Sequence, residues 1–346
     1  MLIVSKRRPA MHYLPAPGEN VVWSGVERLP PGWLPAGIGS GTIRWIRVGS
    51  QSPTAPVFEK WVAALRASLP TPRENETDLS SLAQSLAHLP EVEPAGIIFH
   101  VSRCGSTLLS NALSAGENVL AVNEASAIDQ AMRLAANPGP RGMRTGAAAL
   151  TGLCKAFAHY RGSPAQHLIV KTGMAAVARL RAVRSIWPNV PCVMLTRDPL
   201  EVAVSNLQGP PKALLEWYEV PSTCFADVPD EALACGIAEF CAWAVGRICS
   251  EALEQLDDKC LLLDYRDLTP SAALRVAEFF SVRLTDEGRD SLRGAFLFDA
   301  KRGGEFAPDA DRKKKAAKAS LVESVGRWAR GPYEDLLRSP WRLQAG

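Results

Sequence analysis

The chain has 346 residues, of which 47% are hydrophobic and 22% charged, and its formal net charge is +3. This composition supplies the core of one large α/β domain, or of one such domain with appendages. The small charge excess argues against a nucleic-acid binder, which would be strongly basic, but it leaves room for a local basic pocket. The N-terminus lacks the apolar stretch of a signal peptide, and no segment approaches the ~20 apolar residues that span a bilayer. We therefore expect a soluble, cytoplasmic protein without a membrane partner.

The eight cysteines never form a C-x-x-C pair, and the five histidines are scattered along the chain. Ligand spacing typical of zinc sites is therefore absent, and we expect no metal site. Free, buried thiols in a reducing compartment are the simpler interpretation.

Residues 1–92 show no sustained period and are interpreted as an N-terminal extension packed on the main domain. Alternation over 42–48 predicts a strand. Apolar spacing over 57–66 predicts an amphipathic helix, and leucines at the same spacing over 79–89 predict another.

From residue 93 to 346 the pattern changes to alternating strands and helices, which predicts an α/β domain with a parallel sheet between two helical layers. The expected strands are 96–101, 119–122, 167–170, 193–196 and 260–263. In such sheets ligands bind at the carboxyl ends of the strands. The residues directly after each strand are therefore the first candidates for a site.

The first of these strands is followed by a tight turn, Ser102-Arg-Cys-Gly105, and then by two hydroxyl residues that open a helix. Converging backbone N–H groups and the positive end of the helix dipole make such a turn an anion-binding nest. The Walker pattern for Mg-nucleotides is absent, because no lysine precedes the hydroxyl pair. The loop suits a phosphate, although an ordinary helix start remains an alternative.

A second candidate follows the strand at 193–196. Asp198 predicts a helix N-cap, Pro199 the first helical position, and Glu201 a capping box. Arg197 then stands at the strand end, where its guanidinium can bind a phosphate with two hydrogen bonds. Ser205, two turns into the helix, can add a hydroxyl donor. The alternative is a surface arginine beside a well-capped helix.

Together the two segments resemble the nucleotide-binding elements of the PAPS-dependent sulfotransferase family, whose patterns are P-[KR]-S-G-[ST]-T and R-[DN]-P-x-[DE]-V-A-x-S. The resemblance covers about residues 96–305 and departs from the patterns at Ser102 and Cys104. It implies a three-layer, P-loop-like sulfotransferase fold. The implied donor is 3′-phosphoadenosine 5′-phosphosulfate (PAPS), with PAP as product and no metal. The residues that would bind this nucleotide are Arg103, Cys104, Gly105, Ser106, Thr107, Leu108, Arg197, Ser205, Tyr265 and Lys301.

The resemblance also implies catalytic roles for Arg103, Glu124 and Lys171. Arg103 and Lys171 match basic residues that neutralise the sulfonate and the departing phosphate. The cytosolic branch of the family has a histidine base where this chain has Gly173. Glu124 resembles instead the glutamate base of the tyrosylprotein and heparan branches. The alternative, that Glu124 is the acidic start of a helix over 125–136, stays open.

Two other functions stay open as well: a P-loop-type nucleotide kinase, and a non-catalytic module that binds PAP. The acceptor would be a small molecule or a peptide, bound by the segments 138–147 and 208–228 and by parts of 1–92, and a homodimer is left open. His100, inside a strand, is interpreted as a core residue rather than a catalyst. The basic run at 312–315 is interpreted as a solvated face.

Overall fold

The computed structural model describes residues 28–53, 57–69, 73–116, 118–137, 139–162, 165, 167–221, 225, 227–297 and 310–343. Its centre is a sheet of five parallel strands in the order β5-β6-β4-β7-β8. These strands are β4 (Gly96–His100), β5 (Val119–Asn123), β6 (His167–Lys171), β7 (Cys192–Thr196) and β8 (Cys260–Asp264). Every residue of β4 and β7 is buried, as expected for strands whose two faces are both covered.

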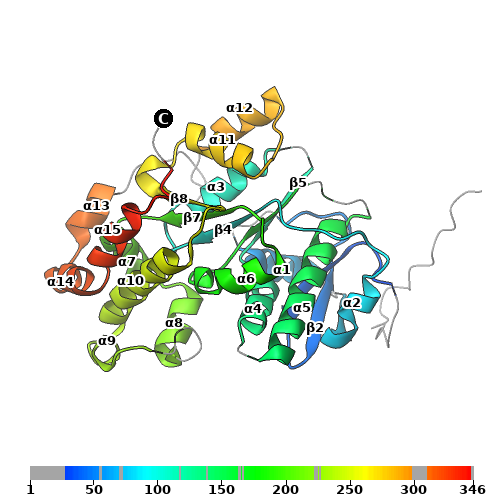
Figure 1. The fold of residues 1–346 in the computed structure, drawn as a ribbon, viewed down its shortest axis with the longest axis horizontal. Coiled ribbons are helices and arrows are strands. Elements are labelled where there is room, and N and C mark those ends of the chain that lie inside the picture. The colour runs from blue at the N-terminus through cyan, green and yellow to red at the C-terminus, as the bar shows by residue number, and fades with distance from the viewer. Residues whose placement is uncertain are drawn as a thin grey trace, which may run out of the picture.

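Helices cover both faces of this sheet, which confirms the predicted α/β architecture with a parallel sheet between two helical layers. Figure 1 shows α3, α11 and α12 on one side and α6 and α10 on the other. The helices of this part of the chain are α3 (Ser106–Leu113), α4 (Ser126–Ala135), α5 (Pro140–His159), α6 (Leu180–Ile186), α7 (Pro199–Gln208), α8 (Lys212–Glu219), α9 (Asp230–Ala234), α10 (Ile237–Gln255), α11 (Pro270–Phe279), α12 (Asp286–Ala295), α13 (Ala310–Ala316), α14 (Ala319–Trp328) and α15 (Arg330–Leu337), with short 3₁₀ turns at Ala176–Arg179 and Tyr265–Asp267.

Three strands run one residue further than the apolar pattern predicts, and each extra residue is polar. Asn123, Lys171 and Asp264 are 6%, 1% and 0% exposed. These residues belong to the strands because the strand pairing continues past the apolar residues. Asn123 of β5 pairs with Lys171 of β6, and Thr196 of β7 pairs with Asp264 of β8. The sheet therefore carries buried polar side chains at its carboxyl edge.

A second, smaller unit forms from residues before β4. It consists of an antiparallel sheet, β1 (Trp33–Ile38), β2 (Thr42–Arg47) and β3 (Glu74–Asp78), with helix α1 (Phe58–Ser68). We call these elements the N-terminal unit. The strand predicted at 42–48 and the helix at 57–66 are confirmed as β2 and α1. The leucine spacing over 79–89 yields less helix than predicted, a 3₁₀ turn at Leu79–Ser81 and one turn of helix α2 (Leu82–Ser85). No side chain caps either start.

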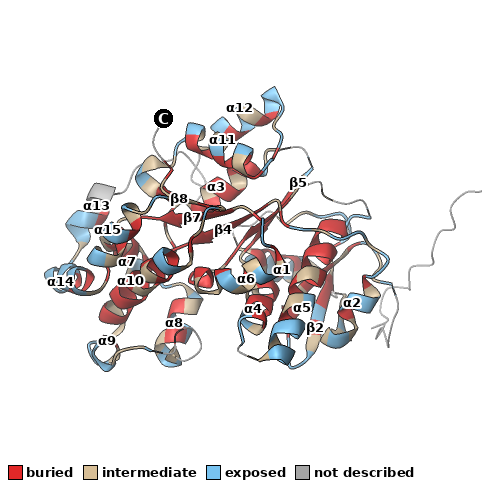
Figure 2. Cartoon of the chain, in the orientation of Figure 1, coloured by how far each residue is buried: buried red, intermediate tan, exposed pale blue. Residues whose placement is uncertain are grey.

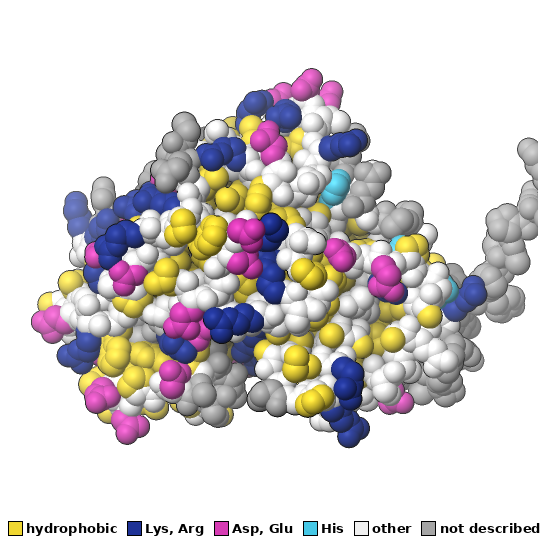
Figure 3. Space-filling view, viewed as in Figure 1, with side chains coloured by type: hydrophobic (Ala, Val, Ile, Leu, Met, Phe, Trp, Pro, Cys, Tyr) yellow, Lys and Arg dark blue, Asp and Glu magenta, His cyan; other side chains and the backbone are white. Residues whose placement is uncertain are grey.

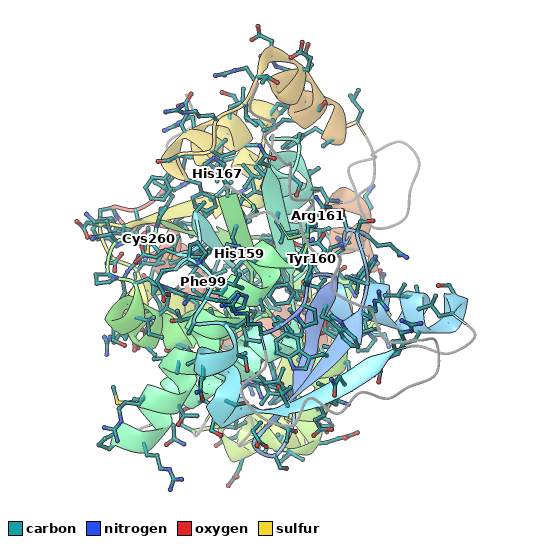
Figure 4. The ribbon with its side chains drawn as sticks, turned by 90° about the vertical axis from the view of Figure 1, so that its right-hand side faces the viewer. Phe99, His159, Tyr160, Arg161, His167 and Cys260 are labelled. Atoms are coloured by element: carbon teal, nitrogen blue, oxygen red, sulfur yellow. The ribbon has the colours of Figure 1, made fainter. Side chains whose placement is uncertain are left out.

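The N-terminal unit is joined to the main sheet's helical layer by hydrogen bonds. The amide of Gly32 donates to the carbonyl of Tyr160 at 2.6 Å, and the amide of Ile38 donates to Gln130 Oε1 at 2.9 Å. Figure 4 labels Tyr160 and Arg161 at the end of α5, beside the small sheet. The unit thus packs on α4 and α5.

Burial follows the layers. Figure 2 shows buried residues in the parallel sheet and on the inward sides of its helices, with exposed residues on the outer sides. The cysteines within the described ranges are free, and all except Cys235 are buried, as their apolar context predicts. Within those ranges, no helix combines the length and apolarity needed to cross a bilayer.

Candidate active site

Five chain segments meet along the carboxyl edge of the parallel sheet, because all five strands run in the same direction. In spatial order they are Glu124 after β5, Lys171 at the end of β6, the 101–105 loop after β4, Arg197 after β7 and Tyr265 after β8. The sequence-predicted residues thus divide into a carboxylate–ammonium side and a guanidinium–aromatic side, with the glycine-containing loop between them.

The loop between β4 and α3 has the backbone of an anion-binding nest. Ser102, Arg103 and Gly105 have φ values of +73°, +50° and +84°, and left-handed non-glycine residues cost roughly 1–3 kcal/mol each. Two features favour glycine at position 105. Its φ is left-handed, and a Cβ there would lie 2.5 Å from Leu268 Cδ2. Having no side chain, Gly105 cannot cap α3, so the helix's first N–H groups face the loop with their positive dipole end.

Buried hydrogen bonds hold this strained loop from beneath. The amide of Ser102 donates to His100 Nδ1 at 3.0 Å, so the ring proton resides on Nε2, which donates to the carbonyl of Thr172 at 2.8 Å. Ser102 Oγ donates to Asn206 Oδ1 at 3.2 Å. Both ring nitrogens of His100 are therefore engaged. Asn206 was not predicted, and its only signal is its place next to Ser205.

Arg197 connects the loop to the second candidate segment. Its side chain is buried, and Nη1 donates to the carbonyl oxygen of Arg103 at 3.1 Å. Its guanidinium lies over the ring of Tyr265, 3.9 Å from the centroid. Nη2 also lies 2.7 Å from Glu201 Oε2. The alternative of a surface arginine is therefore wrong, and the two predicted phosphate-binding segments touch each other.

The helix start beside Arg197 is capped differently from the predicted box. Asp198 caps α7 as predicted, accepting from two first-turn amides at 2.9 and 3.4 Å. The Glu201 carboxylate, however, pairs with Arg197 and lies 3.5 Å from Lys314 Nζ. A neighbouring cation attracts this carboxylate more strongly than a neutral amide does. The capping-box prediction is therefore wrong in its acidic half.

The basic run at 312–315 lies on α13, which packs against α7. Lys313 is buried, and Lys314 reaches Glu201 as described. From α15, Arg330 Nη1 reaches Asp198 Oδ2 at 3.1 Å. Figure 3 shows lysine and arginine side chains over this part of the surface. Lys313 therefore departs from the predicted solvated face, whereas Lys314 and Lys315 are exposed as predicted.

Lys171 and Glu124 form an ion pair at the opposite side of the loop. The Lys171 side chain is fully buried and donates to Glu124 Oε1, while the Glu124 side chain is 27% exposed. His100 Nε2 lies 3.6 Å from the same carboxylate oxygen. Glu124 has a left-handed φ of +52°, and its amide donates to the Lys171 carbonyl at 2.6 Å. The buried ammonium of Lys171 thus pairs with the Glu124 carboxylate, which is partly exposed to solvent.

Asp129, one turn into α4, occupies the space beside Gly173. Both of its carboxylate oxygens accept from the Gly173 amide, at 3.0 and 3.1 Å. A Cβ on residue 173 would lie 2.3 Å from Asp129 Oδ2, so a side chain there would require the Asp129 carboxylate to move. Burial raises the Asp129 pKa to about 6; the negative charge of Glu124 adds to the rise, and the Gly173 amide opposes it.

This raised pKa predicts a pH-dependent stability difference for Asp129→Asn. Because the folded chain holds the Asp129 proton more tightly than the unfolded chain, the contribution to stability is complete below 3.8, the ordinary pKa, and is lost as the pH rises through about 6. Relative to the variant, wild type should lose about 1–2 kcal/mol of unfolding free energy across this window, after allowance for solvent screening. Denaturant unfolding below and above the window measures it.

The exposed Asp258, changed to Asn, provides the matched control and should show no such pH-dependent difference. An Asp129→Asn protein whose stability tracks wild type at every pH would contradict the raised pKa.

The remaining predicted residues are placed as follows. Cys104, Ser106 and Thr107 are buried in the loop and the first turn of α3. Leu108 and Ser205 are partly buried, on α3 and α7 respectively, and the Arg103 guanidinium donates to the carbonyl oxygen of Gly209 at the end of α7. Lys301 lies outside the described residues.

The candidate acceptor segment 138–147 is largely the start of α5 rather than a loop, because Pro140 initiates the helix.

No model of a known protein family matches the chain, and no curated protein matches it in sequence. Among solved structures it is similar to the sulfotransferase STF9 from Mycobacterium avium, with 13% identity, a TM-score of 0.48, and coverage of 78% of this chain and 82% of that one. It is also similar to the sulfotransferase domain from the curacin biosynthetic pathway (14% identity, TM-score 0.38, 72% and 97% coverage) and to a sulfotransferase from Alicyclobacillus acidocaldarius (15%, 0.35, 70% and 99%). Similarity this distant does not by itself assign a function.

Proposed function

We propose that the protein is a sulfotransferase that moves the sulfuryl group of PAPS to a hydroxyl or amine acceptor without a metal ion. The observation that carries this proposal is the 3.1 Å contact between Arg197 Nη1 and the Arg103 carbonyl. It joins two anion-binding segments on one sheet edge, with the Lys171–Glu124 ion pair beside them. A nucleotide with phosphate groups at both ends suits such a paired arrangement.

Different residues at the carboxyl edge of the sheet suit the two phosphate groups and the adenine of PAPS. The left-handed loop and the free amides of α3 suit the 5′-phosphosulfate, as backbone donors at a helix N-terminus do for phosphates generally. The Arg197 guanidinium suits the 3′-phosphate, which would compete with Glu201 for it. Tyr265, stacked on Arg197, offers an aromatic face to the adenine.

Transfer requires the acceptor oxygen or nitrogen to form a bond to sulfur while the bond from sulfur to the bridging phosphate oxygen breaks. The acceptor proton goes to Glu124, whose carboxylate is partly exposed and pairs with the buried ammonium of Lys171. Arg103, Lys171 and the loop amides stabilise negative charge on the transferred group and on the departing phosphate. PAP leaves with the bridging oxygen.

Calorimetric titration with PAP, ADP and Mg-ATP, followed by turnover with labelled PAPS and an acceptor panel, tests the proposal. We expect PAP to bind more tightly than ADP. Arg197→Lys should weaken PAP binding roughly 10- to 100-fold, because lysine loses the planar stacking and the paired hydrogen bonds. ADP binding should change less.

Arg293→Lys, at an exposed position on α12, is the matched control and should bind PAP like wild type. Preferential binding of Mg-ATP would favour a P-loop kinase instead. Tight PAP binding with no turnover on any acceptor would favour a non-catalytic module.

A further inference from the structure

The N-terminal unit places a carboxylate against the start of α4, next to the turn that carries the proposed base. Glu59 lies on α1, and its Oε1 accepts from the amide of Ser126 at 2.5 Å. Ser126 is the first residue of α4, and the N-cap residue Ala125 has no side chain that could cap it. A residue 67 positions away therefore caps the helix that begins two residues after Glu124.

Two hydrogen bonds bracket the strained Glu124 turn. On one side the Glu124 amide donates to the Lys171 carbonyl at 2.6 Å, and on the other the Ser126 amide donates to Glu59. A left-handed φ at a non-glycine residue persists only where its surroundings hold it. The acceptor of the first hydrogen bond belongs to the parallel sheet, and the acceptor of the second belongs to the N-terminal unit.

Glu59 is itself well anchored. Its neighbour Phe58 is 1% exposed and packs edge-on against Phe157 of α5, with ring centroids 5.4 Å apart, and against Trp61 at 5.8 Å. The end of α5 is in turn bonded to the small sheet through Tyr160 (Figure 4). The Glu59 carboxylate thus belongs to a packed interface between the N-terminal unit and the main sheet's helices.

On the basis of the proposed function, we propose that the N-terminal unit completes the active site, with Glu59 as a positioning residue that holds the Glu124 turn through Ser126 and adds negative charge beside it. Among the described residues, the charged or titratable groups that interact with Glu124 include Lys171 from β6, His100 from β4, Asp129 from α4 and Glu59 from α1. Burial raises the pKa of Glu59, and the charge of Glu124 adds to that rise. The two carboxyl groups therefore interact electrostatically.

Two variants separate the charge of Glu59 from its hydrogen bond. Glu59→Gln keeps an oxygen that can accept from Ser126 but removes the charge, whereas Glu59→Ala removes both. With Glu59→Gln, the acid limb of the rate–pH profile should move to lower pH, because a negative charge near the proposed base is gone. With Glu59→Ala, kcat should also fall roughly 10- to 100-fold as the base loses its position.

Amide hydrogen exchange gives a readout that does not depend on turnover. Exchange at Ser126 should become faster in Glu59→Ala and stay at the wild-type rate in Glu59→Gln. PAP affinity should be unchanged in both, since the guanidinium side of the edge is not touched. Glu76→Gln, at an exposed position on β3 of the same unit, is the matched control and should match wild type throughout.

Unchanged Ser126 exchange in Glu59→Ala, or an unmoved acid limb in Glu59→Gln, would overturn the role of Glu59. If Glu59→Ala does not fold, the Glu59→Gln profile decides alone. If wild type shows no turnover with PAPS, the proposed function fails separately, and the exchange measurement still decides whether the N-terminal unit holds the turn.

Discussion

Glu124→Gln should lower kcat by roughly 10²- to 10⁴-fold, the usual contribution of a general base. The amide cannot accept the acceptor's proton, yet it has nearly the same shape as the carboxylate and keeps an oxygen toward Lys171. PAP affinity should change little, because Arg197 and the left-handed loop lie on the other strands of the edge. Single-turnover kinetics and PAP titration measure the two effects separately.

Glu216→Gln makes the same chemical change at an exposed surface pair with Lys212 and should leave kcat unaltered. Near-normal turnover by Glu124→Gln, with PAP binding intact, would show that Glu124 is not the base. Its role would then be that of an acidic residue before α4.

Lys171→Met should lower kcat by roughly 10³-fold, because one substitution removes the partner of the base and a cation for the developing negative charge. Methionine fills the buried volume of the lysine stem, and Glu124 keeps access to water through its 27% exposed side chain. The fold should therefore survive. In a double-mutant cycle with Glu124→Gln, the two losses should be far from additive, as expected for residues that act as a unit.

The chain offers a close control for this experiment. Lys155 is another buried lysine, 7% exposed, that lies on α5 and pairs with Glu91. Lys155→Met should change the melting temperature and leave kcat intact. If Lys171→Met and Lys155→Met lost activity equally, or if the double-mutant cycle were additive, the Lys171–Glu124 pair would not be a catalytic unit.

The sequence predicts the sheet edge well because its signals are local. Each strand is a short apolar run. Asp198 and Pro199 predict the start of the helix after β7, because capping needs only neighbouring residues. Once strands alternate with helices, parallel direction follows, and with it the convergence of Glu124, Lys171 and Arg197 on one edge.

The supporting contacts could not be predicted because they join residues far apart in the chain. Asp129 and Glu59 look like ordinary polar positions on amphipathic helices, and only the packing of α4 against its neighbours brings them to Gly173 and Ser126. Glu201 shows the same limit: its sequence fits a capping box, but a guanidinium from the preceding strand end takes its carboxylate.

Gly173 and Asp129 have a consequence for how the chemistry of this site can be altered. The two positions compete for space, since the first side-chain carbon at 173 would lie 2.3 Å from a carboxylate oxygen of residue 129. A histidine installed at 173 therefore requires the Asp129 carboxylate to move or to be truncated. Truncation at 129 alone leaves the 173 amide without its acceptor. Redesign toward an imidazole base should therefore treat the two positions as a pair, because a side chain at 173 displaces the carboxylate that accepts from the 173 amide.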